Sequence, residues 1–139
     1  MTATLALCLF VGGGLAGRVE AQAFTLSWIH SVEKVRWEED WRLTPAGLVV
    51  AEARVRGTGA GMEPPEGAVL RDGSWHYRPA LPPLPEVVLA DAGVVPDREL
   101  CARGECRPLH AWLRPVDPRA PVTLAVCPAA GDGASRGAP

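Results

Sequence analysis

Val35-Arg36-Trp37-Glu38-Glu39-Asp40-Trp41-Arg42-Leu43 is the stretch that decides the fold. Its odd-numbered residues are apolar except for Glu39, and its even-numbered residues are all charged. A period of two is typical of a β-strand that turns one face to a core and the other to water. A helix over residues 32–43 is the alternative, because Trp37 and Trp41 are spaced one helical turn apart.

The stretch that precedes it alternates in the same way. Its apolar face would hold Phe24, Leu26, Trp28 and His30. A two-residue turn at Glu33-Lys34 would join the two strands and pair Phe24 with Leu43. In this register Glu39 lies opposite Trp28, and His30 becomes a diagonal neighbour of Glu39, within reach of a long side chain.

Turn-forming residues divide the rest of the chain into short strands. Thr44-Pro45-Ala46-Gly47 fits a tight turn. It leads into a strand over 48–56, whose inward face would hold Val49, Ala51, Ala53 and Val55. Hairpins are expected over 69–78, around Asp72-Gly73, and over 98–109, with single strands at 86–90 and 122–126. The pattern predicts an all-β protein, a small antiparallel sandwich or open barrel built from hairpins.

The N-terminal segment resembles a signal for export. The apolar run from Leu5 to Ala16 is too short to span a bilayer, and Ala21-Gln22-Ala23 fits a cleavage site that would start the mature chain at Phe24. Two features disagree. No Lys or Arg precedes the apolar run, and Arg18 and Glu20 lie close to the cleavage site. The alternatives are an uncleaved membrane anchor and a buried element of a cytosolic protein.

These signals divide the chain into three parts. We expect a signal segment at 1–23, a β-rich domain at 24–127 and a disordered tail at 128–139, where Gly, Ala, Ser and Pro dominate. The protein would be periplasmic or extracytoplasmic, or membrane-associated if the N-terminal segment stays in place. The net charge of −2 and the lack of a basic block argue against nucleic acid as a partner. Lys34 is the only lysine, which excludes lysine-based phosphate loops and Schiff-base chemistry at every other position.

The most specific local signal is Cys101-Ala102-Arg103-Gly104-Glu105-Cys106. A two-residue turn at Arg103-Gly104 would make Cys101 and Cys106 a non-hydrogen-bonded pair, in which Cα atoms come closest. A disulfide between them is therefore expected in an exported chain. Other readings are a metal site that also uses Cys127 and His110, and unpaired or redox-active thiols. Cys127 itself is expected to be a small buried hydrophobic residue in the last strand.

His30, Glu33 and Glu39 form a second group, flanked by Trp28, Trp37 and Trp41. Ionisable groups on an apolar face are costly to bury unless they are paired. They could satisfy each other as a structural pair, or they could form a pocket for a polar ligand. Acid–base catalysis by His30 and Glu39 is chemically feasible. No nucleophile elbow and no zinc-protease motif accompanies them.

A third group is the glycine-rich stretch over residues 57–61. Its backbone N–H groups could face an anion. It lacks the Gly-Lys-Ser/Thr of a phosphate loop, and its last glycine is misplaced for a dinucleotide fingerprint. A flexible connector is the alternative interpretation.

The order of these motifs resembles the bacterial domain-of-unknown-function family 1850 over residues 24–109. The motifs are His30-Ser31-Val32-Glu33, Trp37-Glu38-Glu39-Asp40-Trp41, Gly59-Ala60-Gly61, Asp72-Gly73 and the hairpin of Cys101 and Cys106 that ends in Arg107-Pro108-Leu109. Genes of that family often lie beside tripartite ATP-independent periplasmic (TRAP) transporters of the TAXI type. The resemblance therefore implies a periplasmic or membrane-associated accessory of solute uptake, with no catalytic residue to carry over.

Together these observations lead to a binding or accessory module without a cofactor or metal. Its expected partners are the transporter's permease or substrate receptor, or a small anionic solute. The ligand-binding residues we expect are His30, Ser31, Glu33, Glu39, Trp41, Gly59 and Gly61. The alternatives are a small hydrolase or isomerase that uses His30 and Glu39, and a purely structural module.

Overall fold

The computed structural model describes residues 4–29, 35–56, 66–90 and 97–129. The strands over these residues are β1 (Leu5–Val11), β2 (Gly14–Val19), β3 (Ala23–Ile29), β4 (Arg36–Thr44), β5 (Gly47–Arg56), β6 (Val69–Arg71), β7 (Ser74–Tyr77), β8 (Glu86–Leu89), β9 (Glu99–Ala102), β10 (Glu105–Pro108) and β11 (Val122–Pro128). One 3-10 turn, η1 (Leu109–Trp112), follows β10. No helix in these ranges is long and apolar enough to cross a membrane.

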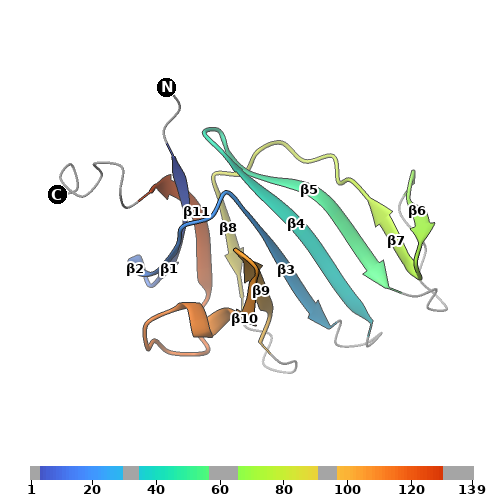
Figure 1. The fold of residues 1–139 in the computed structure, drawn as a ribbon. Helices are drawn as coiled ribbons and strands as arrows, with labels where there is room; N and C mark the ends of the chain where they lie inside the picture. Colours follow the sequence, from blue (N-terminus) through green and yellow to red (C-terminus); the bar gives the residue numbers. More distant parts are fainter. Residues whose placement is uncertain (1–3, 30–34, 57–65, 91–96, 130–139) are drawn as a thin grey trace.

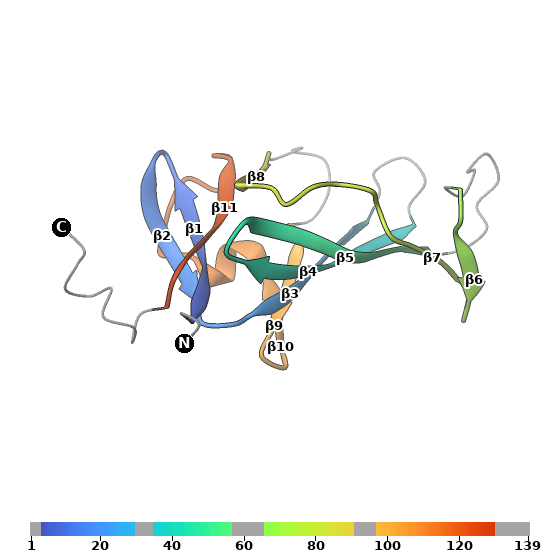
Figure 2. The ribbon, with the colours of Figure 1, turned by 90° about the horizontal axis from the view of Figure 1, so that it is seen from above.

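The strands form two antiparallel sheets, which confirms the predicted all-β fold (Figures 1 and 2). The smaller sheet has the order β2-β1-β11-β8, and the larger has the order β10-β9-β3-β4-β5-β7-β6. Figure 2 shows that the larger sheet extends past the smaller one on the side of β7 and β6. The smaller sheet therefore covers only part of the larger sheet's inner face.

The core lies where the two sheets overlap. It is built from leucines that are at most 1% exposed, together with the aromatic side chains of β3 and β4. The smaller sheet contributes Leu7, Leu9 and Leu124, and the larger contributes Leu26, Leu48 and Leu100. Phe24 stacks on Trp41 with ring centroids 6.2 Å apart.

The register of β3 against β4 differs from the prediction by two residues. Phe24 pairs with Trp41 rather than Leu43, and Glu39 pairs with Leu26 rather than Trp28. The apolar faces still coincide, because a shift by an even number of residues keeps every side chain on its face. Alternation therefore fixed the face, whereas the stacking of Phe24 on Trp41 and of Trp28 on Trp37 accompanies the actual register.

The inward face of β5 was predicted wrongly in its first half. The pairing of β5 with β4 shifts between Asp40 and Trp41, so that Ala51 is an extra residue on β5. Such a bulge inverts the alternation on one side of it. Leu48 and Val50 consequently point into the core in place of Val49 and Ala51, whereas Ala53 and Val55 are buried as predicted.

Three of the predicted hairpin turns are confirmed, and the fourth, at Glu33-Lys34, lies outside the described residues. β4 and β5 join through Pro45-Ala46, and the Thr44 hydroxyl accepts from the Ala46 N–H at 3.1 Å. Asp72-Gly73 and Arg103-Gly104 have positive φ at all four residues, as the tight turns of twisted hairpins require. Cys101 and Cys106 face each other across the second of these turns in a disulfide, with Cα atoms 4.0 Å apart.

Within the expected signal segment, the structure contains β1 and β2, and both strands belong to the smaller sheet. Cys8 on β1 forms a disulfide with Cys127 on β11, with Cα atoms 6.0 Å apart. The expectation that Cys127 is an unpaired buried residue was wrong, because its partner Cys8 lies in the segment that was expected to be removed.

Candidate functional site

At the margin of the core, the inner face of the larger sheet carries two adjacent rows of side chains. One row crosses four strands as Leu26, Glu39, Ala53 and Tyr77, and the next as Trp28, Trp37, Val55 and Trp75. Glu39 thus lies among half-buried aromatic residues, a group that we call the aromatic patch: Trp28, Trp37, Trp75 and Tyr77.

Glu39 is the one carboxyl group in these two rows. Its Oε1 accepts a hydrogen bond from the Trp41 indole Nε1 at 3.0 Å. Burial raises the pKa of Glu39 above its usual value, although the indole bond and the positive charge of Arg98 oppose that shift. Burial and the nearby charge of Glu39 also raise the pKa of Tyr77. A carboxyl group that protonates more readily than usual can both donate and accept hydrogen bonds.

Trp41, expected among the ligand-binding residues, lies beside Glu39 on the same strand. It is only 5% exposed and belongs to the core cluster, so its ring is covered by protein. Its indole N–H holds the Glu39 carboxyl from the same strand, two residues away. Trp41 therefore positions the Glu39 carboxyl group.

The other expected binding residues lie outside the described residues: His30, Ser31, Glu33, Gly59 and Gly61. The described strands that lead toward them are β3, which ends at Ile29, and β5, which ends at Arg56. Both strands pair with β4, on its two sides, and Ile29 and Val55 pair with the neighbouring residues Arg36 and Trp37. β3 and β5 therefore both end beside the Trp28–Trp37 row, at the same end of β4.

The opposite face of the larger sheet carries a network of charges around Arg54. Its guanidinium donates to Asp40 at 2.8 and 2.9 Å, to Glu52 at 2.7 Å and to Glu38 at 3.0 Å. Arg54 lowers the pKa of Asp40 by direct hydrogen bonding, against the opposing effect of burial. For Glu38, burial raises the pKa, but the bonds from Arg54 and Arg36 outweigh it and lower the pKa overall.

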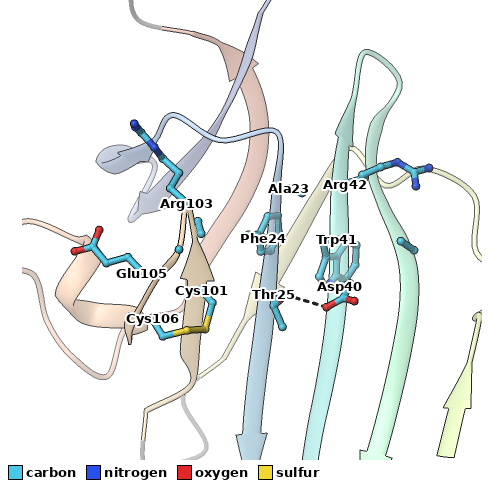
Figure 3. A pocket seen from close by; sticks show the side chains of 13 residues that line it. Ala23, Phe24, Thr25, Asp40, Trp41, Arg42, Cys101, Arg103, Glu105 and Cys106 are labelled. Carbon is cyan, nitrogen blue, oxygen red and sulfur yellow. Dashed lines mark hydrogen bonds between the residues drawn. A yellow bond between two sulfur atoms is a disulfide. The ribbon is translucent and has the colours of Figure 1, made fainter. Parts of the chain in front are cut away.

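An open groove of 520 Å³ lies on this charged face beside the disulfide hairpin (Figure 3). The Cys101–Cys106 disulfide borders the groove on one side, and the Thr25–Asp40 pair, with a hydrogen bond of 2.8 Å, lies across from it. Arg103, Glu105 and Arg42 also line the groove. Of its two acidic groups, Asp40 is bound by Arg54, and Glu105 lies 3.6 Å from Arg107.

The structure does not support the alternative of a cysteine metal site. Glu99, Cys101 and Cys106 bring their potential ligand atoms within 4.8 Å of one another. However, all four cysteines are described and all are in disulfides, so no thiolate is available. The Nδ1 of His110 instead donates to the Asp97 carboxylate at 3.0 Å.

Sequence reasoning missed three members of this site. Trp75 and Tyr77 come from β7, whose pairing with β5 places them in the same rows as Trp37 and Glu39. The alternation of residues 74–77 showed which of them share a face, but not which strand β7 pairs with. Arg98 precedes β9 and acts on Glu39 through its charge, and no sequence pattern pointed to that.

Comparison with known proteins adds one result. The family model described as a domain of unknown function (DUF1850) matches residues 24–109. No curated protein and no solved structure matches the chain.

Proposed function

Because the chain belongs to the DUF1850 family, whose description names no activity, we propose its function from the geometry: an extracytoplasmic binding module that assists a TRAP-type solute uptake system. In this proposal it contacts the substrate receptor, the permease or a small anionic solute. The contact is made through Glu39 and the aromatic patch.

The observation that carries the proposal is the aromatic patch around the carboxyl group of Glu39. The row of Glu39 begins at Leu26 in the core cluster, and Trp28 of the neighbouring row packs against that cluster. Aromatic side chains with a polar group in their midst are typical of binding surfaces, because the rings provide contact area and the polar group fixes orientation. A carboxyl group with a raised pKa can donate a hydrogen bond to an anionic oxygen.

The disulfides support an oxidising compartment. Cys8–Cys127 and Cys101–Cys106 account for every cysteine of the chain. Structural disulfides persist in exported proteins and are rare in the cytosol of mesophiles. A periplasmic location is therefore part of the proposal.

Co-purification from membrane extracts of the producing cell tests this function. The tagged full chain is expected to retain the receptor or the permease of a TRAP-type transporter, and Glu39→Ala is expected to lose that partner. Glu105→Ala is the matched control, because Glu105 is an exposed carboxylate, with a 61% accessible side chain, on the edge strand β10. A wild-type protein that retains neither a transporter subunit nor a solute would favour the purely structural alternative.

The raised pKa of Glu39 favours a second candidate function, an enzyme that uses Glu39 with His30 as acid and base. Incubating the purified protein with the solute of the transporter distinguishes the two. Turnover that disappears in both Glu39→Gln and His30→Ala would favour the enzyme. A solute that is bound but recovered unchanged would favour the binding module.

A further inference from the structure

The N-terminal segment combines the features of a removable signal with those of a core strand. β1 is an inner strand of the smaller sheet, paired with β11 over Leu5–Phe10 on one side and with β2 on the other. Ala6, Leu7 and Leu9 on β1 are fully buried. Its side chains pack against the core residues of the larger sheet.

The charged residues that fit a signal poorly have structural partners. Arg18 donates from Nε to Glu20 at 2.8 Å and from Nη1 to the Cys8 sulfur at 3.6 Å. Its Nη2 donates to the carbonyl of Pro128 at the end of β11. Arg18 therefore connects β2 with both the first and the last strand, which gives it a use only in a chain that keeps this segment.

The glycines of the apolar run also have a specific place. Gly12 and Gly13 form the turn between β1 and β2, with φ of 61° and 83°. Positive φ at both central residues is what a tight hairpin turn requires, and glycine adopts it without strain. Gly17 faces the carbonyl of Trp112, where an added Cβ would come within 2.5 Å.

The apparent cleavage site is built into the larger sheet. Ala23 is the first residue of β3 and pairs with Arg42. The Gln22 carbonyl accepts from the Leu43 N–H at 3.0 Å, and the Gln22 side chain donates to the Leu5 carbonyl at 2.5 Å. The peptide bond after Ala23 is thus held in a hydrogen-bonded strand.

From this geometry we infer that residues 5–23 remain in the working protein, where they form β1 and β2, and that Ala21-Gln22-Ala23 is not a processing site. The Cys8–Cys127 disulfide then joins two strands 119 residues apart in sequence. The structural domain extends from β1 to β11, beyond both ends of the family match at residues 24–109.

Mass spectrometry of the full chain, purified from producing cells without reductant, tests this inference. Every folded molecule is expected to contain residues 5–23, and a digest is expected to give one peptide pair linked through Cys8 and Cys127. Cys127 should resist alkylation until a reductant is added. A folded protein that begins at Phe24, with Cys127 open to alkylation, would overturn the inference.

Ala23→Leu provides a variant that keeps the fold, because the Ala23 side chain is exposed. A bulky residue at this position blocks cleavage by a signal peptidase, which needs small residues there. If the segment is retained, the mass of the variant changes only by the substitution. If the variant keeps the N-terminal segment and the wild type lacks it, the wild type is cleaved after Ala23 and the inference is wrong.

Discussion

At the scale of single residues, Arg54 is the group on which the charged face depends. Its side chain is 19% exposed and binds three carboxylates. Removing the cation from a partly buried cluster leaves like charges facing each other with their hydrogen bonds unmet. The network therefore stabilises the pairing of β4 with β5 only while Arg54 is present.

Replacing Arg54 with Met is expected to lower the free energy of unfolding by about 2 kcal/mol. Arg71→Met is the control, because Arg71 is 59% exposed and lies 3.7 Å from Glu52, and it should cost less than about 0.5 kcal/mol. Urea unfolding at low and high salt measures both. Equal losses in the two variants would show that the Arg54 network contributes no more than a surface ion pair.

Folding disfavours the charge of Glu39. Its pKa is raised in the folded protein, so the folded state binds a proton there more readily than the unfolded state. The resulting stabilisation is complete below the unfolded pKa and is lost as pH rises through the folded pKa. Asp40 and Glu38 behave in the opposite way: their pKa values are lowered, so their stabilisation is lost as pH falls.

Glu39→Gln is expected to raise the free energy of unfolding at pH 7, because the amide removes the buried charge and can still accept from the Trp41 indole. The difference from the wild type should shrink as pH falls through the raised pKa of Glu39. Urea unfolding from acidic to neutral pH measures the trend, with Glu105→Gln as the control that shows none. A variant that is less stable than the wild type at pH 7 would mean that the carboxylate is stabilised in the fold.

At the scale of elements, Gly47 lets the segment around Leu84 pack closely against the β4–β5 hairpin. Its φ is +133°, and an added Cβ would collide with the carbonyl oxygen of Leu84. That carbonyl accepts from the Leu48 N–H at 2.8 Å, so it cannot move away without breaking a backbone bond. Gly104 has a φ of +78° but open space around it.

Gly47→Ala is therefore expected to cost about 3 kcal/mol, and Gly104→Ala only about 1 kcal/mol, because the second substitution adds strain without a collision. Thermal and urea unfolding of the two variants measure the difference. If both cost the same, the approach of Leu84 to Gly47 is not a constraint on the fold.

The two disulfides should differ in their contribution. Cys8 and Cys127 are 119 residues apart in the sequence, whereas Cys101 and Cys106 are 5 residues apart. The loop-entropy account gives about 5 kcal/mol for the long loop and about 2 kcal/mol for the short one. We expect the Cys8→Ser/Cys127→Ser variant to lose more stability than the Cys101→Ser/Cys106→Ser variant. The opposite order in urea unfolding would mean that β1 contributes little to the folded state.

Alternation and turn residues in the sequence predict strands and hairpins, but they do not predict register or bulges. Alternation was sufficient for the strand at 36–44 and for its buried face, and paired turn residues were sufficient for the Arg103-Gly104 hairpin. The register was out by two residues because parity cannot distinguish such shifts. The bulge at Ala51 was missed because an extra residue on one strand is recognised only from its partner.

At the scale of the whole molecule, the features that the sequence did not predict are those that depend on pairing between strands far apart in the chain. β1 finds β11 across most of the chain, and an apolar run with small residues is equally typical of an inner strand and of a signal. Likewise, Glu39 was recognised from its own strand, whereas Tyr77 joined the site only through the pairing of β7 with β5. Sequence patterns identified individual strands and turns, and the topology assembled the site.

Solute uptake is the measurement that tests the proposed function most directly. Cells that lack the gene are complemented with the wild type, His30→Ala, Glu39→Ala or the control Glu105→Ala, and folding of each variant is checked by its disulfide content. We expect His30→Ala and Glu39→Ala to lower the initial uptake rate by about tenfold, the equivalent of one lost hydrogen bond to a charged group, while the control matches the wild type. Uptake at the wild-type rate in both variants, with both proteins folded, would contradict the proposal.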